Sequence, residues 1–69
     1  MSQYYEIRIK GHLDQSWADW LAGLSIRHLD SGETLLTGPL RDQAELHGVL
    51  NRLRDLGVEL ISVNPAEDT

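Results

Sequence analysis

The sequence predicts an α+β fold in which a four-stranded antiparallel sheet carries two helices on one face. Three observations predict it. Residues 4–10 alternate apolar and polar side chains, residues 24–38 form two such segments around a glycine turn, and residues 42–56 repeat leucines at helical spacing. A short segment with two tryptophans precedes the glycine turn, and a β-branched apolar segment over 58–63 comes last. The predicted order is strand, helix, strand, strand, helix, strand.

A short helix is predicted between the first strand and the hairpin. Ser16 or Asp14 can cap its amino end, since both side chains accept hydrogen bonds from the N–H groups of a first helical turn. Trp17 and Trp20 are three residues apart and would share one helical face. Gly23 can adopt the left-handed conformation that ends many helices. Because a helix this short is unstable alone in water, packing must hold it.

The hairpin is predicted to turn on a two-residue loop, residues 31–32, where glycine supplies the positive φ. This loop length sets the register, so that Ile26 opposes Thr37 and His28 opposes Leu35. One face then receives Leu24, Ile26, His28, Leu35 and Thr37. The other receives Ser25, Arg27, Leu29, Thr34 and Leu36.

The long helix is predicted over residues 42–56. Asp42 and Glu45 form a capping pair at its start, and Gly57 ends it. Its apolar stripe consists of Leu46, Val49, Leu50, Leu53 and Leu56. The last strand, over 58–63, points apolar residues to both of its faces.

Length and composition predict one domain, over residues 1–64, followed by an acidic, disordered tail over 65–69. A chain of 69 residues without cysteine has no disulfides to stabilise it, so association with a second copy is expected instead. The formal net charge of -5 disfavours nucleic acid. No apolar run approaches the roughly 20 residues that span a bilayer. We therefore expect a cytoplasmic homo-oligomer, with a dimer favoured, that binds neither nucleic acid nor membrane.

The expectation of a dimer rests on the sheet face that the helices leave uncovered. Tyr4, Leu29 and Leu36 are predicted to lie on it, together with one pair from the last strand, either Val58 and Leu60 or Ile61 and Val63. A second copy would cover this apolar surface, face to face or by pairing strand edges. An unknown protein or small molecule is the other partner considered.

The three histidines, His12, His28 and His47, lack the spacing of a metal site. No cofactor motif is present, and no serine has the context of a nucleophile. We therefore predict no metal, no cofactor and no catalytic residue, and a non-enzymatic module for homo-oligomeric interaction or small-ligand binding. The alternative is a small isomerase- or hydrolase-type enzyme that uses His12 or His47 as an acid or base at a subunit junction.

Gly48 is unexpected inside a helix, because glycine there costs about 1 kcal/mol relative to alanine. Close packing by the backbone of another element or by a second copy is the favoured explanation, and a ligand beside His47 is the other. Trp17 and Trp20 are expected to fill the core, with an aromatic wall for a ligand as the alternative. The candidate ligand or interface residues are Tyr4, His12, Trp17, Trp20, Leu36, His47 and Gly48.

The order of elements resembles the ferredoxin-like β-α-β-β-α-β superfold, which by itself implies no particular function. Four segments also resemble a group of short, uncharacterised bacterial proteins: residues 5–13 (YEIRIKGHL), 17–20 (WADW), 32–39 (GETLLTGP), and 42–48 (DQAELHG) continuing to 57. The resemblance covers nearly the whole chain. It implies a bacterial, single-domain cytosolic protein and assigns no activity.

Overall fold

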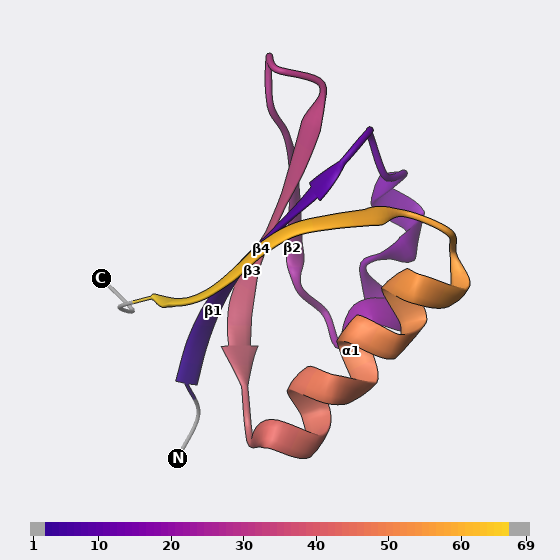
Figure 1. Cartoon of the computed structure of the whole chain (residues 1–69). Helices are drawn as coiled ribbons and strands as arrows, with labels where there is room; N and C mark the ends of the chain where they lie inside the picture. Colours follow the sequence, from indigo (N-terminus) through magenta and orange to yellow (C-terminus); the bar gives the residue numbers. More distant parts are fainter. Residues whose placement is uncertain (1–2, 67–69) are drawn as a thin grey trace.

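In the computed structural model, which describes residues 3–66, an antiparallel sheet of four strands packs against one α-helix (Figure 1). The elements are β1 (Gln3–Lys10), two 3₁₀ turns (Gln15–Trp17 and Asp19–Leu21), β2 (Ser25–His28), β3 (Glu33–Leu40), α1 (Gln43–Asp55) and β4 (Glu59–Ala66). The strand order is β2-β3-β1-β4, and every neighbouring pair is antiparallel. The sheet is therefore continuous, with β2 and β4 at its edges.

The core lies between the sheet and α1 and is built from aliphatic side chains. Its buried members are Ile7, Ile9, Leu13, Leu21, Leu24, Ile26, Leu36, Leu40, Leu46, Val49 and Leu53. The apolar stripe predicted for the long helix is confirmed at Leu46, Val49 and Leu53. So is its cap: the backbone N–H of Glu45 donates to Asp42 Oδ1 at 2.9 Å. This helix covers one face of the sheet and leaves the other open.

The prediction of a ferredoxin-like sandwich with two helices is wrong, although the four-stranded antiparallel sheet is present. Two 3₁₀ turns replace the first predicted helix. Of the two predicted caps, Asp14 is the one observed: its side chain accepts a 2.9 Å hydrogen bond from the Ser16 N–H. The backbone of the following turns forms i→i+3 hydrogen bonds. Ala22 and Gly23 then both take positive φ, 62° and 72°, so no α-helix can propagate.

The hairpin loop contains three residues, 30–32, one more than predicted. The Leu29 N–H donates to the Glu33 carbonyl at 2.8 Å, which closes the loop outside these three residues. Gly32 takes a φ of 87°, as the last residue of such loops often does. Ile26 therefore pairs with Leu36 rather than with Thr37. This shift of one residue turns Leu36 into the core, so its predicted place on the uncovered face is wrong.

Strand β4 extends through Ala66, two residues beyond the predicted domain boundary, and pairs Pro65 with Tyr5 of β1. The remainder of the predicted tail, 67–69, lies outside the described residues. A β-bulge interrupts the pairing, because Ile9 opposes Leu60 while Arg8 opposes Ser62. The bulge places both Leu60 and Val63 on the α1 side of the sheet, so neither predicted pair of β4 residues lies on the open face.

The open face of the sheet carries the charged residues of β1 beside its apolar ones. Glu6, Arg8 and Lys10 of the inner strand β1 alternate with its buried residues and are exposed on this face. Arg8 Nε lies 3.5 Å from an oxygen of Glu33 on the neighbouring strand. Tyr4, Leu29 and Leu35, the last in place of Leu36, are half-buried on this face, so the apolar surface predicted there is interrupted by charged residues.

Candidate functional site

Trp17 and Trp20 lie on the surface of the 3₁₀ segment, each 38% exposed. Their ring centroids are 5.3 Å apart, with a tilt of 57° between the rings. The guanidinium of Arg52 on α1 lies 5.6 Å from the centroid of the Trp20 ring and donates to the Trp20 carbonyl oxygen. The prediction that the tryptophans fill the core is wrong, because they pack against each other and against Arg52 at the surface.

A hollow of about 310 Å³ lies on one flank of α1. It is lined by Ala22, Ala44, Glu45, Gly48, Val49 and Arg52. A Cβ added at Gly48 would meet nothing within 4 Å, so the predicted close packing by another element of the same chain is wrong. Arg52 borders the hollow and also stacks on Trp20, which joins the two features. We call Trp17, Trp20 and the hollow together the tryptophan surface.

His47 lies on the opposite flank of α1 from this hollow. It lines a groove of about 400 Å³ between α1 and β4, which we call the α1–β4 groove. The other lining residues are Leu50, Asn51, Leu53, Arg54, Val58 and Leu60. His47 and Gly48 are adjacent in the sequence, but successive helical residues point about 100° apart. The predicted joint site at these two residues is therefore divided between two surfaces.

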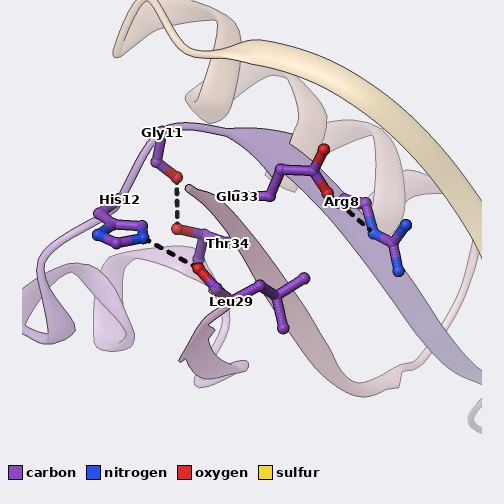
Figure 2. Close-up of polar contacts among 6 residues, drawn as sticks. All are labelled: Arg8, Gly11, His12, Leu29, Glu33 and Thr34. Carbon is purple, nitrogen blue, oxygen red and sulfur yellow. Dashed lines mark hydrogen bonds and ion pairs between the residues drawn. The ribbon is translucent and has the colours of Figure 1, made fainter. Parts of the chain in front are cut away.

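His12 and His28 form a stacked pair at one end of the sheet, with ring centroids 4.5 Å apart and 9° between the ring planes. His12 Nε2 lies 3.3 Å from the Leu29 carbonyl oxygen, and His28 Nε2 lies 2.6 Å from that of Leu13 (Figure 2 shows the first contact). With its Nε2–H donating, each ring binds the chain at a carbonyl. The pair therefore ties the loop after β1 to the hairpin.

The buried Thr34 side chain completes this connection. Its hydroxyl donates to the Gly11 carbonyl at 2.6 Å and accepts a 3.2 Å hydrogen bond from the Leu13 N–H (Figure 2 shows the first bond).

Sequence reasoning missed the histidine pair because its members lie 16 residues apart on different elements (28 minus 12). The strand order contains the signal: β1 and β2 are both antiparallel to β3, so their carboxyl ends meet at one end of the sheet.

Asp14 lies beside this pair at the start of the 3₁₀ segment. Hydrogen bonds from the backbone and side chain of Ser16 hold the pKa of Asp14 below its usual 3.8, and the nearby His28 adds to the effect. Within residues 3–66, no group of three or more His, Asp or Glu side chains is arranged to hold a metal ion.

Tyr4 remains on the open face as predicted. It is half-buried between Pro39 of β3 and Ala66 of β4. Of the seven predicted candidates, Trp17 and Trp20 contact each other, and Arg52 links Trp20 to the hollow that Gly48 lines, while Tyr4, His12 and His47 lie on separate surfaces and Leu36 is buried.

A family model described as Domain of unknown function (DUF8691) matches residues 4–64. The sequence matches no curated protein and no solved structure. Between residues 3 and 66, no helix combines the length and the apolar character needed to cross a membrane.

Proposed function

We propose that this chain, which belongs to the DUF8691 family of unknown function, is a non-enzymatic interaction module that associates with a second copy through the tryptophan surface. The observation that carries the proposal is Gly48. Glycine inside a helix costs about 1 kcal/mol relative to alanine. Gly48 has no neighbour that would exclude a methyl group. A helical glycine that nothing in its own chain requires supports a close approach by another chain.

Arg52 at the hollow and the two tryptophans beside it are residue types that dominate protein interfaces. Tryptophan and arginine are enriched among the residues whose truncation costs most binding energy. Trp17, Trp20 and Arg52 already hold one another in place, with the Trp20 ring under the Arg52 guanidinium. A partner would therefore bind a preformed aromatic surface, and little side-chain ordering would oppose association.

The charges at the hollow favour a second copy as the partner. Glu45 and Arg52 lie equally far along α1 on either side of Gly48 and Val49. If two α1 helices packed antiparallel about a two-fold axis near Gly48, Glu45 of each copy would face Arg52 of the other. Ala44 and Gly48 would let the two helices approach closely. In this packing the surface is self-complementary in charge.

The test is the mass of the protein by light scattering from about 1 μM to about 1 mM. We expect the mass to approach twice the 7.8 kDa of one chain. Trp17→Ala and Trp20→Ala should each raise the dissociation constant about tenfold or more, as truncation at an interface hot spot does. Tyr4→Ala, on the open face, is the matched aromatic control and should dimerise normally. A wild-type mass of one chain throughout, or loss of the dimer only in Tyr4→Ala, would contradict the proposal.

The enzyme alternative has less support. His12 lines neither the hollow nor the α1–β4 groove. His47 lines the groove, but no carboxylate or other histidine stands among the groove residues to orient its ring or share its proton.

We further infer a bacterial-type, cytoplasmic protein from the resemblance of its segments and from a cysteine-free chain. We expect no nucleic-acid partner at a net charge of -5.

A further inference from the structure

The α1–β4 groove has an apolar floor and a rim of hydrogen-bond donors. The floor is formed by Leu50, Leu53, Val58 and Leu60, and the rim by His47, Asn51 and Arg54. The rim residues recur on α1 at helical spacing, so they share one flank of the helix. Leu60 contributes from the sheet because the bulge in β4 turns it to the α1 side, and 46% of it remains exposed. An apolar molecule in the groove would remove that surface from water.

The lining of the groove contains one arginine, Arg54, and no carboxylate. The protein carries a formal net charge of -5, yet no acidic residue lines the groove. In the ion pairs of residues 3–66, Arg8 pairs with Glu33 and Arg41 with Glu45, whereas Arg54 has no acidic partner. A guanidinium presents a planar set of donors that matches a carboxylate. The charge arrangement therefore favours an anionic group at this rim.

We infer that the α1–β4 groove binds a small organic acid with an apolar body. Its carboxylate binds Arg54, with Asn51 or His47 as a second donor, and its hydrocarbon part covers Leu50, Val58 and Leu60. The volume of about 400 Å³ lies within the usual range of small-molecule sites.

A small molecule fits this groove better than an added peptide strand does. A strand would have to pair along the outer edge of β4, which the bulge at Ile61 and the proline at position 65 both interrupt. The site is also independent of the proposed dimer contact, because Gly48 and Arg52 lie on the other flank of α1. Failure of either proposal therefore leaves the other standing.

The probe is sodium octanoate, titrated into the ¹⁵N-labelled full chain and followed by amide chemical shifts. We expect saturable shifts centred on residues 47–60. Arg54→Gln should weaken binding about tenfold, the loss expected for a charge-assisted hydrogen bond. Arg41→Gln, which removes an exposed arginine outside the groove, is the matched control and should bind normally. Amide spectra of both variants establish that they are folded.

Octan-1-ol supplies the same hydrocarbon without the charge and should bind about tenfold more weakly than octanoate. Equal binding of the alcohol would overturn the role of Arg54. Shifts that do not saturate, or that spread over the whole protein, would overturn the site itself. If an uncharged, extended apolar peptide shifted the β4 amides while octanoate did not, strand addition would replace the small-acid proposal.

Discussion

Replacing Gly48 with alanine separates the stability of one copy from its association with another. The added methyl group improves helix propensity and meets no atom of its own chain, so the free energy of unfolding of the monomer should rise by up to about 1 kcal/mol. The same methyl group would enter the space between two paired helices and weaken the dimer. Thermal unfolding at low concentration measures the first effect, and light scattering measures the second.

Asn51→Ala is the matched control for this change, because it raises helix propensity on the opposite flank of α1. It should stabilise the monomer and leave the dimer intact. If Gly48→Ala dimerised as tightly as the wild type, the glycine would have no role in the contact.

At the scale of elements, α1 was predictable because several local signals agree: an Asp42 cap, a stripe of leucines at helical spacing, and Gly57 beyond the end. The 3₁₀ segment was not predictable in the same way, because both Asp14 and Ser16 can cap it and because the positive φ of Ala22 gives no signal in the sequence. The loop of the hairpin was also ambiguous. Its serine and glycine suit two-residue and three-residue loops alike. The one-residue difference in loop length decides which face of the sheet Leu36 occupies.

The Asp14 cap gives the 3₁₀ segment a pH dependence. Its pKa in the folded chain is below the usual 3.8 because the Ser16 N–H binds the carboxylate. The charged cap therefore stabilises the fold above pH 3.8, and this contribution is lost as the pH falls through the lower, folded pKa. Asp14→Asn keeps a capping oxygen that does not titrate.

Thermal unfolding at pH 6 and at pH 3 should show a larger loss of stability in the wild type than in Asp14→Asn. The difference should be small, because Asp14 is exposed to solvent. An equal loss in both proteins would show that another carboxylate governs the acid response.

For the whole molecule, the site depends on how the elements meet. The sequence singled out Trp17, Trp20 and Gly48 separately, but only the contact between Arg52 and Trp20 places them on one surface. The expectation of a dimer first rested on an apolar open face. The burial of Leu36 and the β4 bulge reduce the apolar part of that face, and the proposed contact lies instead on the helix side. Residue spacing along the chain predicts neither the link between Arg52 and Trp20 nor the composition of the open face. The first follows from the docking of the 3₁₀ segment on α1, and the second from strand register.

Exchanging the charges at the proposed two-fold axis tests the central claim most directly. Glu45→Lys places like charges opposite Arg52 of the second copy, and Arg52→Glu does the same opposite Glu45, so each variant alone should remain monomeric by light scattering. An equimolar mixture restores opposite charges at both contacts. The account predicts that the mixture recovers a mass near twice 7.8 kDa. A mixture that stays monomeric while the wild type dimerises, or single variants that dimerise like the wild type, would contradict it.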